Sequence, residues 1–156
     1  MKQRSFAISD VLPHAAPMLL LDELLDYGSE HTACAVTIRQ DSLFCDGDRG
    51  VPSWVGLEYM AQTLSTFGGI EEASRGLPPS IGLLLGSRRY RADTPYFAIG
   101  TRLRIVANLL LRDEHNLVAF DCAIYDGEHV LARGDIKAYR PADVHAVVRG
   151  ERISPA

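Results

Sequence analysis

One carboxylate in this sequence lies in an apolar stretch that has the spacing of a helix. Residues 52–62 read P-S-W-V-G-L-E-Y-M-A-Q, and Glu58 is the only charged residue among them. An acid on such a helix is costly to bury unless a partner compensates its charge. Glu58 is therefore the first candidate for a proton-transfer residue. The alternatives are a buried acid satisfied by a hydrogen bond and an acid exposed at the edge of a dimer.

The first turns of the same helix offer further groups near Glu58. Trp54 and Gln62 stand one turn before and one turn after it, on the same side of the helix. Backbone N–H groups at a helix N-terminus can stabilise a developing oxyanion, so Ser53, Trp54 and Val55 are predicted to bind substrate. Gln62 is a further predicted substrate-binding residue, and an orienting or packing amide is its more conservative interpretation.

A second proton-transfer group could come from five histidines, of which His14 is the strongest candidate. It stands in the segment L-P-H-A-A-P, where Pro13 and Pro17 restrict the backbone. A structural capping role for His14 is an equal alternative. No pattern favours the other four, which lie near predicted turns, before a strand or in the C-terminal tail: His31, His115, His129 and His145.

The candidate residues need a scaffold of one long helix and several strands. The helical spacing of apolar residues continues to about Ser74, and Gly76 and Pro78 end it. Apolar residues cover more than one face of this helix, so other structure is expected to wrap it. Residues 18–27 fit a strand or a short helix, and the chain from 141 onward a short helix or a tail. Alternating apolar and polar residues predict strands at 32–39 and 101–112, and further strand-like runs lie at 81–91, 117–125 and 129–139.

A curved antiparallel sheet wrapped around one buried helix gives each element a place for its apolar face. The sequence therefore predicts an α+β protein with the hotdog fold. We expect a single domain over residues 1–156, with its core at about 11–140.

Composition and charge exclude several classes of protein. The chain has 156 residues and a formal net charge of -4, whereas dedicated nucleic-acid-binding proteins are usually basic. Three scattered cysteines (Cys34, Cys45 and Cys122) and isolated histidines offer no disulfide framework and no metal-binding spacing. The start of the chain lacks a signal-peptide pattern, and no apolar stretch approaches the ~20 residues of a membrane span. We expect a cytoplasmic protein without a bound metal and without membrane insertion.

Three segments in order resemble the hotdog-fold 3-hydroxyacyl-acyl-carrier-protein dehydratases of fatty-acid synthesis. L-P-H-A-A-P-M-L-L-L-D (12–22) is similar to the opening motif of that family. P-S-W-V-G-L-E-Y-M-A-Q is similar to its helix motif, with Glu58 at the glutamate, and I-G-L-L-L-G-S-R-R-Y-R (81–91) to its next strand. The helix motif also resembles a divergent branch from gene clusters for aryl polyenes.

The resemblance implies an enzyme that removes water from a 3-hydroxyacyl thioester to give the trans-2-enoyl thioester, in fatty-acid or polyene biosynthesis. It implies a substrate carried on the phosphopantetheine of acyl-carrier protein and no other cofactor. The resemblance assigns the catalytic glutamate to Glu58, and His14 is our candidate for the second catalytic group. The tunnel would form between two subunits, in a homodimer or in a heterodimer with a second hotdog subunit.

One departure from the family keeps other functions open. The dehydratases carry a catalytic histidine in a G-H-F-P loop before the helix, whereas the corresponding loop here reads C-D-G-D-R-G-V-P (45–52). Its Asp46 and Asp48 are interpreted as surface carboxylates. The alternatives are a hotdog acyl-thioesterase, in which Glu58 activates water, and a non-catalytic subunit that completes the site of a partner.

A dense basic patch lies in the strand after the helix and is formed by Arg88, Arg89 and Arg91. Acyl-carrier proteins are strongly acidic, so the patch is predicted to dock one. The alternative is a solvated sheet edge whose charges balance Asp93 and Glu71.

Overall fold

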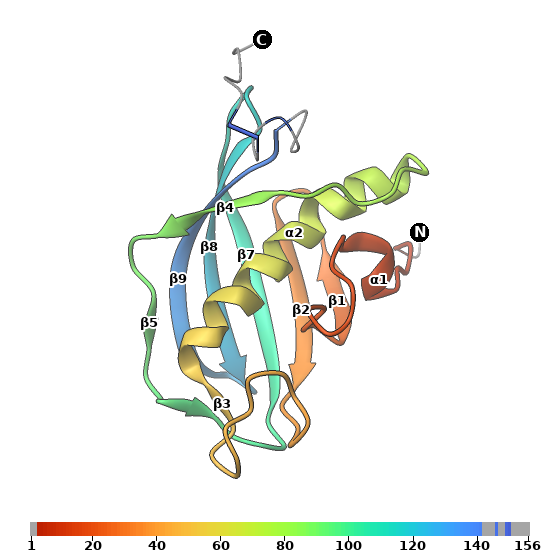
Figure 1. Cartoon of the computed structure of the whole chain (residues 1–156). Coiled ribbons are helices and arrows are strands. Elements are labelled where there is room, and N and C mark those ends of the chain that lie inside the picture. Colours follow the sequence, from red (N-terminus) through yellow and green to blue (C-terminus); the bar gives the residue numbers. More distant parts are fainter. Residues whose placement is uncertain (1–2, 142–145, 147–148, 151–156) are drawn as a thin grey trace.

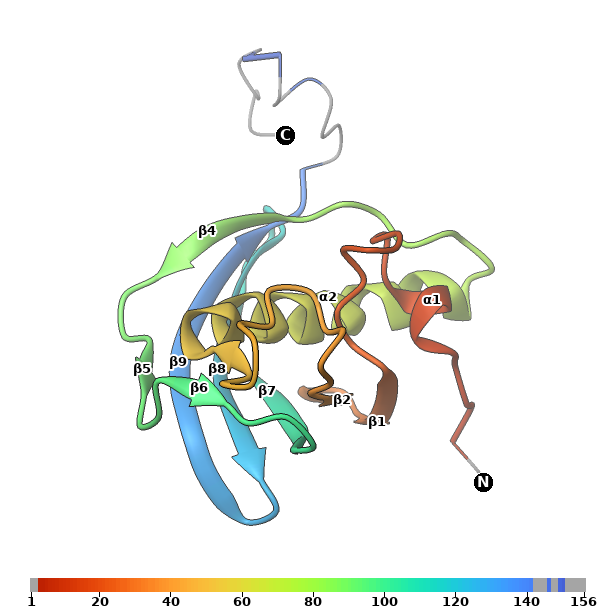
Figure 2. The ribbon, with the colours of Figure 1, turned by 60° about the horizontal axis from the view of Figure 1, so that its bottom comes forward.

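A seven-stranded antiparallel sheet curls around one long helix in the computed structural model (Figures 1 and 2). The structure describes residues 3–141, 146, 149 and 150. The hydrogen-bonded order of the strands is β1-β2-β7-β8-β9-β4, and the short β5 pairs with β9. These strands are β1 (Glu23–Tyr27), β2 (His31–Thr37), β4 (Leu83–Ser87), β5 (Arg91–Ala92), β7 (Arg102–Arg112), β8 (Leu117–Asp126) and β9 (His129–Tyr139). A second, two-stranded sheet pairs β3 (Val51–Pro52) with β6 (Tyr96–Phe97).

The long helix confirms the prediction for residues 53–74. A 3-10 turn, η1 (Ser53–Val55), leads directly into α2 (Gly56–Ser74). A short helix, α1 (Ile8–Val11), packs beside it (Figure 1). Within the part of the chain that the structure describes, no helix combines the length and the apolar character needed to cross a membrane.

The predicted strands are confirmed, with two differences. In residues 18–27 only the stretch from Glu23 is a strand. The stretch 81–91 is divided into β4 and β5, because the carboxylate of Asp135 accepts the backbone N–H groups of Arg88 and Arg89 at 3.2 and 3.1 Å. These bonds hold a bend at Arg88, where the sequence predicts a continuous strand. Most of the chain beyond residue 141, including His145, lies outside the described residues.

The core lies between α2 and the concave face of the sheet (Figure 2). Phe67 of α2 meets Phe120 of β8 edge to face, with ring centroids 5.4 Å apart, and Tyr59 packs on Phe97 of β6 at 6.1 Å. Such aromatic pairs add to the stabilisation that apolar burial provides. The apolar positions of the helix are therefore covered by the sheet, as the sequence predicts.

Two of the three cysteines belong to this core. Cys34 and Cys122 are buried, and Cys45 is half-buried. Burial raises the pKa of the Cys34 thiol to about 12, so it stays protonated at neutral pH. Both buried thiols thus act as small apolar side chains, which agrees with the absence of a cysteine motif.

A close contact between α1 and α2 depends on Gly69. A Cβ atom at this position would lie 1.9 Å from the carbonyl oxygen of Val11. Only glycine permits this approach of the two backbones. Since His14 follows Val11 by three residues, the contact also sets where the segment with His14 meets the helix.

We expect Gly69→Ala to lower the free energy of unfolding by about 2 kcal/mol, because the added methyl group collides with backbone that has little room to move. Alanine has the higher helix propensity, so an isolated helix would show the opposite sign. The midpoint of urea denaturation measures this loss of stability. The matched control is Gly82→Ala, where the nearest atom to the new Cβ would be 3.8 Å away. Equal midpoints for the two variants would contradict the packing argument.

Candidate active site

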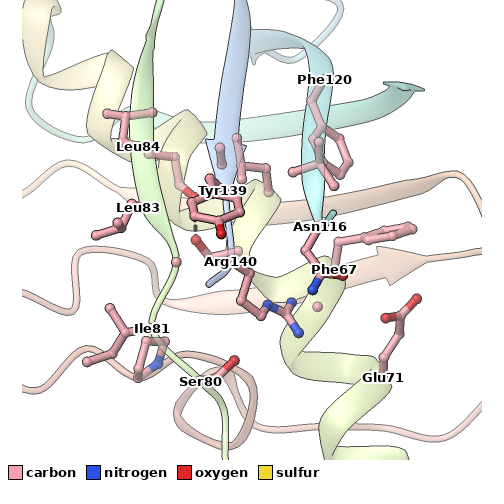
Figure 3. A pocket seen from close by; sticks show the side chains of 18 of the residues that line it. Phe67, Glu71, Ser80, Ile81, Leu83, Leu84, Asn116, Phe120, Tyr139 and Arg140 are labelled. Carbon is pink, nitrogen blue, oxygen red and sulfur yellow. Dashed lines mark hydrogen bonds between the residues drawn. The ribbon is translucent and has the colours of Figure 1, made fainter. Parts of the chain in front are cut away.

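A cavity of about 380 Å³ runs along α2 (Figure 3). The helix forms one wall, the segment that leads into β4 forms the opposite wall, and residues at the ends of β7, β8 and β9 complete it. Apolar side chains line its middle: Leu64, Phe67, Leu83, Leu84, Val118 and Phe120. Concave, largely apolar sites with a few polar groups are the usual form of small-molecule sites.

Glu58 and His14 meet at one end of this cavity. The imidazole Nε2 of His14 lies 4.0 Å from the carboxylate Oε1 of Glu58, and the side chains are 28% and 34% exposed in the isolated chain. This distance exceeds a hydrogen bond, so both groups keep capacity for a third partner. The other ring nitrogen, Nδ1, is buried and has no hydrogen-bond partner among the described residues. The two predicted proton-transfer residues thus face one space.

Gln62 fixes the carboxylate of Glu58. Its side chain is fully buried, and its Nε2 donates to Glu58 Oε1 at 3.0 Å and to the carbonyl of Met18 at 2.8 Å. Its Oε1 accepts the backbone N–H of Leu20 at 3.0 Å. All of these polar atoms are bonded within the protein. The geometry therefore favours the orienting amide over a substrate-binding residue.

The groups at the start of the helix are largely engaged by the fold. The backbone N–H of Ser53 donates to the carbonyl of Pro95 at 2.9 Å, so it is not a free oxyanion donor as the sequence suggested. The carbonyl of Ser53 accepts the hydroxyl of Tyr90, and the Val55 side chain is buried. This start of α2 is thus tied to the segment between β4 and β6.

Trp54 occupies a different position from its neighbours. It is 64% exposed and packs edge to face on Phe44, with ring centroids 5.8 Å apart. The two rings, with Met18, Leu84 and Glu58, line a second, smaller hollow of about 260 Å³. Trp54 therefore presents an exposed apolar surface directly beside Glu58.

The remaining predicted polar residues lie outside the large cavity. Asp46 pairs with Arg49 at 3.5 Å, and Asp48 accepts a bond from Gln40, as expected for surface carboxylates. His31 pairs with Asp26 at 2.9 Å, and this hydrogen bond lowers the pKa of Asp26. No group of three or more potential metal ligands gathers anywhere in the described ranges.

The basic patch of Arg88, Arg89 and Arg91 is exposed. Arg91 lies 3.7 Å from Asp93, whereas Glu71 is bound to Arg112 through two hydrogen bonds of 2.6 and 2.9 Å. Among the described residues the side chains of Arg88 and Arg89 have no acidic partner.

Sequence reasoning missed the polar residues at the far end of the cavity. Arg112 pairs there with Glu71, and Arg140 with Glu72 at 3.1 Å. These partners stand 41 and 68 residues apart. No local pattern connects residues at such separations, so only the fold brings them together.

Comparisons with known proteins find one matching family model and one related structure of similar length. A family model described as ApeP dehydratase (ApeP-like) matches residues 6–149. The chain is 33% identical to a chain of the dehydratase heterocomplex ApeI:P from Xenorhabdus doucetiae, with a TM-score of 0.87, covering 96% of this chain and 100% of that chain. A comparison with curated proteins finds no match.

More distant structures share only the fold. The uncharacterized protein PH1136 from Pyrococcus horikoshii is 12% identical, with a TM-score of 0.63 and coverage of 88% of this chain and 96% of that chain. The PaaI protein from the phenylacetic acid degradation operon of E. coli is 14% identical, with a TM-score of 0.57 and coverage of 75% and 81%. With the sheet that curls around α2, these likenesses confirm the hotdog fold.

Gln62→Met tests the role of the buried amide. The variant keeps the volume but leaves the Leu20 N–H and the Met18 carbonyl without partners, and we expect a loss of about 2–4 kcal/mol in the free energy of unfolding. Chemical denaturation measures it. Gln40→Met is the control, because the amide of Gln40 is exposed and bonds only surface groups. A loss no larger than that of the control would show that the buried amide is dispensable.

Proposed function

The chain belongs to the ApeP-like family of dehydratases, and from this we propose that it takes part in removing water from a 3-hydroxyacyl chain carried by acyl-carrier protein. The observation that supports the proposal is the convergence of His14 and Glu58 at one end of an apolar cavity. An acyl chain fits such a cavity, and its reacting carbons need two proton-transfer groups at the opening.

The reaction requires two proton transfers and no redox step. A base takes the proton from the carbon beside the thioester carbonyl, and its electron pair forms the new carbon–carbon double bond. The C–O bond at the next carbon breaks, and an acid protonates the departing oxygen, which leaves as water. Glu58 and His14 divide these two transfers between them, with the Glu58 carboxylate held at Oε1 by Gln62.

We further propose that a second hotdog subunit covers this site. Exposed apolar side chains surround Glu58 in the isolated chain: Met18, Phe44, Trp54 and Leu84. The edge strand β4 also exposes Leu85, and an open apolar edge is suited to pairing with another strand. The related chain from Xenorhabdus doucetiae is part of a heterocomplex, ApeI:P. A heterodimer is therefore the assembly that we favour.

The basic patch is the proposed docking surface for the acidic carrier protein. Arg88 and Arg89 follow β4, and the next residue, Tyr90, bonds to the carbonyl of Ser53 at the start of α2. The patch is thus anchored to the end of the helix that carries Glu58. A carrier protein bound there would deliver its phosphopantetheine arm at the same end of the molecule.

Glu58→Gln tests the proposed chemistry, because it keeps the size of the side chain and removes its ability to exchange a proton. We expect kcat to fall by ~10²–10⁴-fold on a 3-hydroxyacyl chain bound to acyl-carrier protein. Mass spectrometry of the intact carrier protein measures the loss of one water. Glu114→Gln changes a carboxylate on an exposed hairpin and is the control, with unchanged kcat.

The assay is run on the protein alone and on its mixture with the ApeI subunit of Xenorhabdus doucetiae. Activity only in the mixture would support the heterodimer. Release of a free thiol in place of an enoyl thioester would indicate a thioesterase. Wild-type turnover by the Glu58→Gln variant in the active mixture would assign the chemistry to the partner and leave this chain as a supporting subunit.

Replacing both Arg88 and Arg89 by alanine tests the docking surface. We expect about a tenfold rise in KM for the carrier-bound substrate and a weaker dependence on salt, because an attractive charge pair is lost. The KM for the same acyl group on free pantetheine should not change. The control replaces Arg102 and Arg104, which removes the same charge elsewhere on the surface. An equal rise in KM for both double variants would show that only net charge matters.

A further inference from the structure

The cavity has a defined length because it follows α2. Glu58 lies in the first turn of the helix, and Gly68 lies ten residues further on, a distance of ~15 Å along the axis. Three of the four helix residues that line the cavity between them are apolar (Ala61, Leu64 and Phe67), and the fourth is Ser65. An acyl chain that entered at Glu58, as the proposed function requires, would run towards Gly68.

A guanidinium group forms the far end of this path. Figure 3 shows Arg140 reaching across the hollow between Ser80 and Glu71. Its Nη1 lies 3.1 Å from Oε1 of Glu72, and the two side chains are only 33% and 15% exposed. The path therefore changes from apolar to charged at this point.

Arg140 lies directly on the backbone of the helix at Gly68. A Cβ atom at Gly68 would come within 1.2 Å of Nη2 of Arg140, so the guanidinium occupies space that any side chain at this position would take. The other end of the ion pair is also held, because Glu72 accepts the N–H of Ser80 at 2.8 Å. The backbone N–H of Arg140 donates to the carbonyl of Asn116 at 3.2 Å. Glu72 and the Gly68 backbone therefore position the guanidinium, and the bond to Asn116 fixes the backbone of Arg140.

Such a fixed ion pair limits the length of an apolar ligand. Each methylene buried between the apolar walls is expected to strengthen binding by roughly fourfold. A chain that extends past Gly68 would meet a charged pair, whose separation leaves two half-buried charges uncompensated. The gain per methylene should therefore end at Arg140.

We propose that Arg140 is a specificity-determining residue that sets the maximum length of the acyl chain by closing the cavity over Gly68. The inference deepens the proposed function, because it assumes that an acyl chain enters at Glu58. It names the ligand class as acyl chains whose unbranched end reaches no further than the fourth turn of α2.

The test is the affinity of a series of saturated acyl-pantetheine thioesters of increasing length. Isothermal titration calorimetry is carried out on the protein and on its mixture with the ApeI subunit of Xenorhabdus doucetiae. The wild type should gain affinity per methylene up to a limit and none beyond it. In Arg140→Ala the gain should continue, so that a chain two methylenes past the limit binds roughly 16-fold more tightly than it binds to the wild type.

Arg140→Lys is a second test of the proposal, which can be used if the alanine variant does not fold. It keeps a cation for Glu72 but removes the guanidinium from Gly68, and it should shift the limit in the same direction by a smaller amount. Arg102→Ala removes an exposed arginine that pairs with Glu23 and should keep the wild-type limit. The proposal is overturned if the limit is the same in the wild type and in the folded Arg140 variants. Failure to bind any chain would overturn it as well.

The binding measurement needs no turnover, so its result is independent of the dehydration assay. A protein that loses its length limit in Arg140→Ala but forms no enoyl product would keep the length rule and lose the proposed function. A protein that forms the enoyl product but has the same length limit in Arg140→Ala would keep the proposed function and lose the length rule.

Discussion

The hydrogen bonds of one buried amide determine the geometry of the site. Gln62 must offer its oxygen to the N–H of Leu20 and one amide hydrogen to the carbonyl of Met18, because neither backbone group can reverse its role. Its remaining hydrogen then points to Oε1 of Glu58, which accepts it. Oε2 is left as the oxygen of Glu58 that is open to a further partner. The same amide also ties α2 to the segment that contains His14.

Close packing around α2 supports this arrangement at three further places. Gly69 admits the carbonyl of Val11, Gly68 admits the guanidinium of Arg140, and the hydroxyl of Tyr90 reaches the carbonyl of Ser53. In each case a segment distant in sequence contacts the helix backbone itself. Side chains on the helix can therefore be placed accurately, because the helix has little freedom to rotate or slide against its surroundings.

The sequence predicted what depends on local patterns and missed what depends on tertiary contacts. Periodicity identified α2 and the strands, and the motif around Glu58 indicated the family. His14 was predicted as the partner of Glu58 because Pro13 and Pro17 restrict its backbone, since the histidine of the family's G-H-F-P loop is absent. The N–H of Ser53, which the sequence suggested as an oxyanion donor, bonds to the carbonyl of Pro95, 42 residues later, and nothing near Ser53 reveals this. Arg140 and Gly68 looked ordinary for the same reason.

The two ends of the cavity differ in a way that favours one of them for the proposed chemistry. At the far end, Arg112 binds Glu71 through two short hydrogen bonds, which lower the pKa of Glu71 and keep it ionised. An arginine and a carboxylate that are joined by two hydrogen bonds exchange protons with a ligand only at a high energetic cost. At the near end, His14 and Glu58 stand 4.0 Å apart, and the Glu58 carboxylate keeps an oxygen without a hydrogen bond to the described residues. A substrate can therefore hydrogen-bond to the groups at the near end, whereas the charged groups at the far end already pair with each other.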